Sequence, residues 1–324
     1  MGYARVCEKF RGASPRLYVV QSDYASISYP LLLRSTKDLP FNPTLSARWD
    51  STTPDFTGPL LTGADDRVVG AFPSLCDGLF RSEGIVAEFA HLHPWSSARA
   101  TLDPSACFYN RDIIWLDLTL GLDELWRDQF QHCCRKNIAR AAREGIKVFS
   151  GSSDDDIREF LRIYTGTMIA RHALPQYHFS HSFFCAMRDE LAESARFVFA
   201  EYENQIVAAT LYLHDAMDVF SFLGGADTRF QMLRPTNALI WETIQWARAA
   251  GKKRLILGGG YKPDDGVFRF KATFSRLRQP FHVYSRVHLE QDYALLEQQC
   301  CEYYRIAELP AGYFPSYRQR LQPA

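Results

Sequence analysis

Three short apolar runs, rich in β-branched and aromatic residues, stand out in the second half of the chain. Turn residues separate them, Glu203-Asn204 after the first run and His214-Asp215 after the second. Runs of this length and composition, bounded by turns, predict strands. The predicted strands of this meander are residues 195–202, 205–213 and 218–225.

A helix is predicted to follow the meander. Residues 236–251 place Ile240, Ile244 and Ala247 at helical spacing, with Thr236 as a plausible N-cap and Gly251 at the end. A further strand, 254–258, closes this unit.

A similar order of elements occurs earlier, although the residues do not repeat. Residues 16–21, 27–34 and 45–51 predict a meander, and they are followed by residues 55–63, an apolar-rich stretch at 68–80 and a strand at 85–92. The chain therefore reads as two copies of one α/β (α+β) plan, each a mixed, largely antiparallel sheet flanked by helices.

The segment between the copies predicts a strand ending near Asp117, two helical stretches, a stop at Gly145 and a new strand. On the second helix Lys136, Arg140 and Arg143 recur at spacings of four and three residues. This basic stripe is either a solvated helix face or a contact for a polyanion such as RNA. The opposite face is predicted to carry Ile138, Ala141 and Ala142.

A serine- and aspartate-rich stretch at 151–156 then predicts the start of a further helix, so a domain boundary is expected close to Ser150. The expected division is a first subdomain at 1–149, a catalytic subdomain at 150–288 and a helical tail at 289–324 that packs back on the first.

Composition narrows the classes of function only slightly. The chain has 324 residues, and 37 Lys and Arg balance 37 Asp and Glu, so any anion site must be a local patch. No signal peptide or membrane span is evident, which predicts a cytoplasmic protein. The eight cysteines form no C-x-x-C pair, and His91 with His93 lack a third ligand, so no metal is predicted.

The stretch 257–275, LGGGYKPDDGVFRFKATFS, carries the most distinctive chemistry. A phosphate-binding loop of the Walker type needs Lys and Ser or Thr after its last glycine. Here Gly260 precedes Tyr261 and Lys262, and the following Pro263 and Asp264 predict a turn. The glycines are therefore interpreted as a tight backbone turn, not as a phosphate cradle.

Four segments together resemble the FemABX-type aminoacyltransferases, which belong to the Gcn5-related N-acyltransferase (GNAT) fold. They are RKNIARAAREGIKV, LRPTNALIWETIQWARAAGKKRLILGGG, DGVFRFKATFS and the near-terminal YFPSYR. The resemblance implies two tandem GNAT-like subdomains. It also implies transfer of an amino acid from aminoacyl-tRNA to an amine acceptor, often a peptidoglycan precursor, without a cofactor.

The resemblance further implies that Lys271, next to Phe270, stabilises the transition state. Elementary chemistry agrees, because an amine that attacks an activated ester needs alignment and positive charge at the oxyanion, not an enzyme nucleophile. The alternative is a surface lysine beside two core phenylalanines, Phe270 and Phe274. No general base is identified from the sequence.

The remaining candidate residues concern binding. The loop 229–237 contains no glycine, and Pro235 removes a backbone donor, so it does not suit the pyrophosphate of acyl-CoA. Arg234 is predicted to contact a phosphate, and Asn237 to turn inward at the helix start. The remaining substrate-binding candidates are Arg171, Tyr177, Tyr261 and Phe270.

Two other functions remain open at this stage. The GNAT fold also suits an N-acyltransferase that uses acyl-CoA or an acyl-carrier-protein thioester, which the loop without glycine disfavours. A binding module without catalysis is the third reading, which the Phe270-Lys271 segment disfavours.

Overall fold

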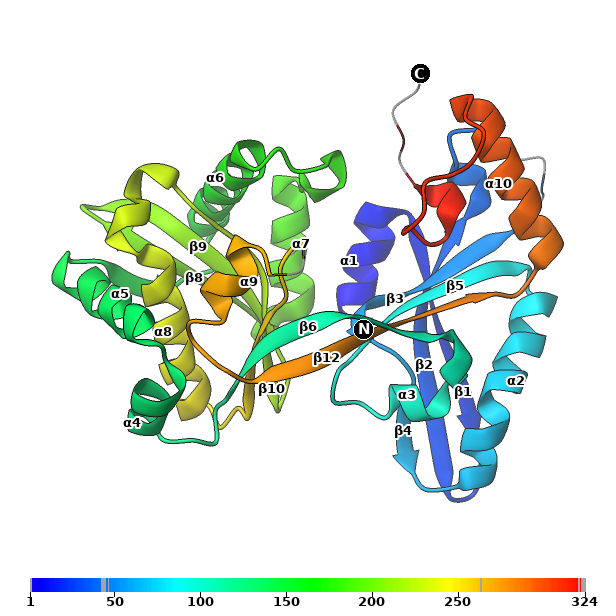
Figure 1. The fold of residues 1–324 in the computed structure, drawn as a ribbon, viewed down its shortest axis with the longest axis horizontal. Coiled ribbons are helices and arrows are strands. Elements are labelled where there is room, and N and C mark those ends of the chain that lie inside the picture. The colour runs from blue at the N-terminus through cyan, green and yellow to red at the C-terminus, as the bar shows by residue number, and fades with distance from the viewer. Residues whose placement is uncertain (1, 42–44, 46, 263, 320, 322–324) are drawn as a thin grey trace. The chain divides into compact units, whose positions relative to one another are not determined.

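A computed structural model of the chain describes residues 2–41, 45, 47–262, 264–319 and 321 (Figure 1). The chain forms two compact units. Residues 3–110 and 280–324 make up the first, and residues 111–279 make up the second.

The first unit carries a sheet with the strand order β1-β2-β3-β5-β12, and β4 pairs with β2. Its strands are β1 (Ala13–Gln21), β2 (Ala25–Ser35), β3 (Trp49–Thr57), β4 (Leu60–Gly63), β5 (Ile85–Leu92) and β12 (Arg278–Val287). Its helices are α1 (Gly2–Arg11), α2 (Asp66–Ser82), α3 (Ala98–Thr101) and α10 (Glu290–Tyr304), with 3₁₀ turns η1 (Thr36–Asp38), η2 (Pro104–Ala106) and η7 (Ser316–Arg318).

The second unit carries the strand order β6-β11-β10-β9-β8-β7. Its strands are β6 (Cys107–Asp117), β7 (Lys147–Ser150), β8 (Ala195–Tyr202), β9 (Gln205–His214), β10 (Asp218–Ala226) and β11 (Arg254–Gly258). Its helices are α4 (Leu122–Glu124), α5 (His132–Arg143), α6 (Asp154–Ala170), α7 (His181–Leu191), α8 (Pro235–Ala249) and α9 (Gly266–Lys271). Short turns complete it: a π-helical turn, η3 (Leu125–Gln129), and 3₁₀ turns η4 (Pro175–Tyr177), η5 (Ala192–Ser194) and η6 (Thr228–Leu233).

Both units follow the same plan, as the sequence predicts. Each has an antiparallel meander, then a crossover helix, then a strand that runs parallel to the last strand of the meander. The parallel pair is β3 with β5 in the first unit, where α2 is the crossover. It is β10 with β11 in the second, where α8 is the crossover.

The units divide the chain differently from the expected boundaries at 149/150 and 288/289. The strand that follows β5, β6, pairs antiparallel with β11 of the second unit. The strand that follows β11, β12, pairs antiparallel with β5 of the first. The divisions therefore lie after Asn110 and before Pro280, and α10 belongs to the first unit. Strand partners so far apart in sequence leave no mark in local composition.

The helices of the second unit cover both faces of its sheet (Figure 1). Strand side chains alternate between faces, and β8 shows the result. The Phe197 ring packs edge-on against Phe160 of α6, with 5.1 Å between ring centroids. Its neighbour Val198 belongs to a core cluster with Ile240 and Ile244 of α8.

The helix starts include one confirmed cap and one correction. Ser153 caps the start of α6, in agreement with the serine- and aspartate-rich helix start predicted from the sequence, and it forms a reciprocal capping box with Asp156. Thr236 is not the N-cap of α8, because that helix begins at Pro235 with Arg234 before it. Proline is favoured at the first helical position, where its missing N–H has no intrahelical partner to lose.

The strand expected at 45–51 begins later than predicted, at Trp49, and residue 46 lies outside the described residues. All eight cysteines are free thiols, four of them buried. Among the described helices, none is both long and apolar enough to cross a bilayer. Within the described ranges, His, Cys, Asp and Glu side chains nowhere gather in a group that could hold a metal ion.

A buried hydrogen-bond network lies in the core of the first unit. The side chain of His288 is fully buried, with Nδ1 2.9 Å from Asp77 Oδ1 and Nε2 3.1 Å from Glu88 Oε2. The Tyr29 hydroxyl donates to the other oxygen of Glu88.

Replacing His288 by Phe should destabilise the chain strongly. Glu88, only 1% exposed, would lose the partner that offsets the burial of its charge. Removing one partner of a buried pair costs about 3–5 kcal/mol. The free energy of unfolding, measured by urea denaturation, should fall by this amount. Arg81→Gln is the control, because Arg81 binds the same Asp77 but is 48% exposed, and exposed pairs contribute under about 1 kcal/mol. A loss below 1 kcal/mol in His288→Phe would contradict this assignment.

Candidate active site

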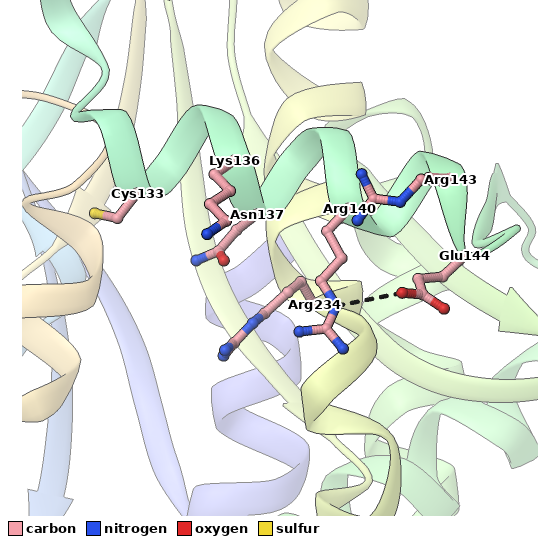
Figure 2. A pocket seen from close by; sticks show the side chains of 7 residues that line it. All are labelled: Cys133, Lys136, Asn137, Arg140, Arg143, Glu144 and Arg234. Atoms are coloured by element: carbon pink, nitrogen blue, oxygen red, sulfur yellow. Dashed lines mark ion pairs between the residues drawn. The ribbon is translucent and has the colours of Figure 1, made fainter.

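A pocket of about 460 Å³ lies between α5 and the start of α8 in the second unit. Its described lining residues are Cys133, Lys136, Asn137, Arg140, Arg143, Glu144 and Arg234. Figure 2 shows that the α5 side chains Lys136, Asn137 and Arg140 point to the side from which Arg234 enters. The predicted basic stripe and the predicted phosphate contact, which are far apart in sequence, therefore line one pocket.

The pocket is strongly cationic. Of its seven lining residues, four are Lys or Arg and one, Glu144, is acidic. Arg140 Nε lies 3.4 Å from the Glu144 carboxylate, so this acid offsets part of the charge of one arginine. Helix α5 presents the stripe because Ile138 and Ala141 on its other face are buried, whereas Ala142 is exposed, contrary to prediction.

Arg234 owes its place to an unusual backbone. Its φ of 62° and ψ of 40° put it in the left-handed conformation between η6 and α8. Its Nε atom is buried and has no hydrogen-bond partner among the described residues. Since buried donors are nearly always satisfied, this guanidinium suits an anionic ligand in the pocket.

Asn237 lies in the first turn of the same helix and is only 2% exposed, so it points inward as predicted. Its amide nitrogen is buried without a hydrogen-bond partner in the described part of the chain. The sequence therefore predicted the direction of this side chain.

The glycine run forms a turn that already holds an anion from the protein itself. The Asp265 carboxylate accepts hydrogen bonds from the backbone of Tyr261 at 2.6 Å and of Lys262 at 3.0 Å. It also accepts from the backbone of Phe268 at 2.8 Å and so caps α9. These amides are therefore not available to a nucleotide phosphate, which agrees with the interpretation of the sequence. Pro263 lies outside the described residues.

Lys271 ends α9 and lies over this turn. Its Nζ atom donates to the carbonyl oxygen of Gly259 at 2.8 Å. A Cβ atom added at Gly258, where φ is 80°, would lie 3.5 Å from Lys271 Nζ. Burial lowers the pKa of the Lys271 ammonium to about 8, against the opposing effect of the Asp265 charge. Lys271 is therefore not an ordinary surface lysine.

Phe270 is half-buried and packs on the core of the second unit. Its ring lies edge-on to Phe274, with 5.7 Å between centroids. The start of α5 binds the chain just beyond Lys271, since the Gln131 backbone donates to Thr273 O at 2.8 Å and its side chain to Ala272 O at 3.2 Å. These bonds connect the lysine-bearing helix to the helix that carries the basic stripe.

The other predicted binding residues do not line the pocket. Arg171 follows α6 and is exposed, and Tyr177 lies in η4, where its carbonyl accepts from the Tyr164 hydroxyl at 2.7 Å. Tyr261 is 75% exposed in the glycine turn. Their roles in binding stay predictions.

Sequence reasoning missed two residues that shape the lysine turn. Asp265 could have been found, because an aspartate three residues before Phe268 matches an N-cap pattern. Arg111 gave no local signal, because it reaches the Gly260 carbonyl, 149 residues away, from β6 at a distance of 2.6 Å.

Comparisons with known proteins agree with this geometry. Residues 130–272 match the model of the acetyltransferase (GNAT) domain family. This range spans the pocket and Lys271. Over 163 residues, 49% of this chain, the sequence is 29% identical to a UDP-N-acetylmuramoylpentapeptide-lysine N(6)-alanyltransferase from Weissella viridescens. The chain spans about half of that relative, 47% of its length.

Two solved structures share the fold. A crystal structure of FemX matches 91% of this chain and 93% of its own, with a TM-score of 0.71 and 13% identity. A tandem GNAT protein from the clavulanic acid biosynthesis pathway matches 89% of this chain and 87% of its own, with a TM-score of 0.52 and 9% identity. The two α/β units are thus tandem GNAT-like units with the fold of FemX, and residues 130–272 match the GNAT domain family.

Proposed function

We propose that this protein transfers an amino acid from an aminoacyl-tRNA to an amine acceptor and so forms an amide bond. The acceptor class is a peptidoglycan precursor, a peptide or a small amine-bearing metabolite. The Weissella relative, an alanyltransferase by name, supports an amine acceptor of the first kind. The reaction would take place in the cytoplasm, where charged tRNA is made.

The observation that carries the proposal is the junction between β10 and α8. In acyl-CoA-dependent members of the fold, backbone amides of a glycine-rich turn hold the pyrophosphate at a helix N-terminus. Here η6 and the left-handed Arg234 occupy that junction, and Pro235 offers no amide. Arg234 instead adds a guanidinium to a pocket with Lys136, Arg140 and Arg143. Several cations in one pocket suit the closely spaced phosphates of an RNA backbone.

The chemical step needs little from the protein beyond position and charge. The acceptor nitrogen attacks the ester carbonyl, and its electron pair forms the C–N bond while the carbonyl oxygen becomes an oxyanion. Lys271 donates a hydrogen bond from its ammonium to that oxyanion. The C–O bond to the ribose then breaks, and the proton lost by the amine leaves with the ribose hydroxyl or with solvent. Because the ester is already activated, the proposal includes no cofactor.

An assay with charged tRNA tests the identity of the amino-acid donor. Purified protein, aminoacyl-tRNA and a mixture of candidate amines should yield an aminoacylated product by mass spectrometry. Treating the charged tRNA with RNase beforehand should abolish the product, because the pocket cations bind the RNA. Product that survives RNase, or equal product from acyl-CoA with saturable binding, would favour the alternative, a GNAT acyltransferase that uses a thioester donor.

Lys271→Met should lower kcat by about 10²–10³-fold, the usual effect of removing one oxyanion donor. Activity of the wild-type protein should also fall as pH rises through about 8, because the lowered pKa turns the ammonium into a neutral amine there. Lys147→Met, an exposed lysine on β7, is the control and should keep full activity. Circular dichroism checks that both variants are folded. Near-normal turnover in Lys271→Met would reject its assigned role.

The pocket cations should act on binding and not on chemistry. Replacing Arg140 or Arg234 by Gln should raise the KM for charged tRNA by about tenfold, the effect of one charge-assisted hydrogen bond. The dependence of log KM on log salt should become shallower by roughly one for each lost phosphate contact. Arg158→Gln on α6, an exposed arginine paired with Asp155, serves as the control. A KM unchanged in the pocket variants would rule out this surface as the RNA contact.

A further inference from the structure

The carboxylate of Asp265 joins the two segments that hold Lys271. One segment is the turn after β11, whose Tyr261 and Lys262 amides donate to Oδ2. The other is α9, whose Phe268 amide donates to Oδ1. A helix of six residues has little stability of its own, so its position relative to the turn depends on this link.

The turn is shaped around that carboxylate. A Cβ atom at Gly260 would lie 2.3 Å from Asp265 Oδ1 and 2.7 Å from its Cγ. A side chain cannot be added there unless the carboxylate moves. A Cβ atom at Gly266, the first residue of α9, would meet open space, so the two glycines differ in what a methyl group would disturb.

Lys271 meets the same turn from the other end of α9. Its Nζ donates to the carbonyl of Gly259, and Arg111 Nη1 donates to the next carbonyl, that of Gly260. The peptide groups of this turn are thus fixed by two cations on their oxygens and by one carboxylate on their amides.

We propose that Asp265 is a positioning residue for Lys271: it fixes the carbonyl on which the ammonium rests and supplies the negative charge that keeps this partly buried amine protonated. The inference rests on the proposed function, in which the protonated Lys271 meets the oxyanion. Asp265 itself touches no substrate in this scheme.

The charges around Lys271 favour this assignment. Backbone amides, that of Phe268 above all, lower the pKa of Asp265 to about 2, so it is ionised whenever the enzyme works. From β6, the cation of Arg111 donates to the turn, and the neighbouring Asp112 approaches it with its backbone carbonyl. The start of α5 contributes the neutral Gln131 and Cys134, whose thiol pKa burial raises to about 12. Among the described charges, Asp265 is the one that raises the pKa of Lys271.

The first test compares Asp265→Asn with its neighbour Asp264→Asn. Acylation of Lys271 by a small anhydride, followed by mass spectrometry over a range of pH, reports the protonation of this amine without any substrate. Wild-type and Asp264→Asn protein should show a midpoint near pH 8. In Asp265→Asn the midpoint should fall by at least about half a unit, because an opposite charge has been removed. The alkaline limb of kcat should move with it.

A second pair of variants covers the case in which Asp265→Asn folds poorly. Gly260→Ala leaves Asp265 in place but forces its carboxylate away, so it should also lower the midpoint and kcat. Gly266→Ala, in open space, should match the wild type in both. These two variants each add one methyl group, one in the turn and one at the first residue of α9.

The outcomes separate this inference from the proposed function. An unchanged Lys271 midpoint in both Asp265→Asn and Gly260→Ala would overturn it, even if activity fell, because a purely structural role predicts a loss that is equal at every pH. A shifted midpoint in a protein that transfers nothing from charged tRNA would uphold the link between Asp265 and Lys271 and reject the function.

Discussion

An ammonium group that leaves water must find an oxygen to accept its hydrogens, and in the second unit Lys271 finds the Gly259 carbonyl. The backbone at the end of β11 is built around this bond. Gly258 takes a left-handed φ beside Nζ, and a Cβ at Gly259 would lie 2.9 Å from Arg111. Burial costs the ammonium hydration and lowers its pKa. Only small residues allow so close an approach of backbone to a charged side chain.

At the start of α8, by contrast, a residue with a long side chain occupies a backbone conformation that favours glycine. A glycine-rich turn would present backbone amides to a phosphate, with no net charge. Here a residue with a side chain, Arg234, takes the left-handed conformation at a cost of about 1–2 kcal/mol. In this conformation Arg234 places a full positive charge in the pocket beside Arg140 (Figure 2). A pocket that presents charges instead of amides suits a long polyanion better than one pyrophosphate.

Local patterns in the sequence predicted much of this architecture. The meander, the crossover helices, the cap at the start of α6 and the basic stripe all arise from residues close together in the chain. The division into units was not predictable in this way, because β6 and β12 find partners far away in sequence. The same limit applies to the site. Lys271 was predicted from a motif, whereas Arg111 reaches the turn through a contact that no local pattern records.

The pocket cations and Lys271 differ in their exposure to water and salt. On the proposed mechanism, salt therefore affects the binding of RNA more than the chemical step. Lys136 and Arg143 are exposed, so dissolved salt would screen their attraction for RNA phosphates, with a screening length of about 10 Å at 0.1 M salt. Lys271 is screened less, because protein surrounds its ammonium and a carbonyl already holds it. On the proposed mechanism, high salt weakens the encounter with RNA yet leaves the rate at saturation nearly unchanged. On this proposal, affinity and turnover depend on different charges of the same unit.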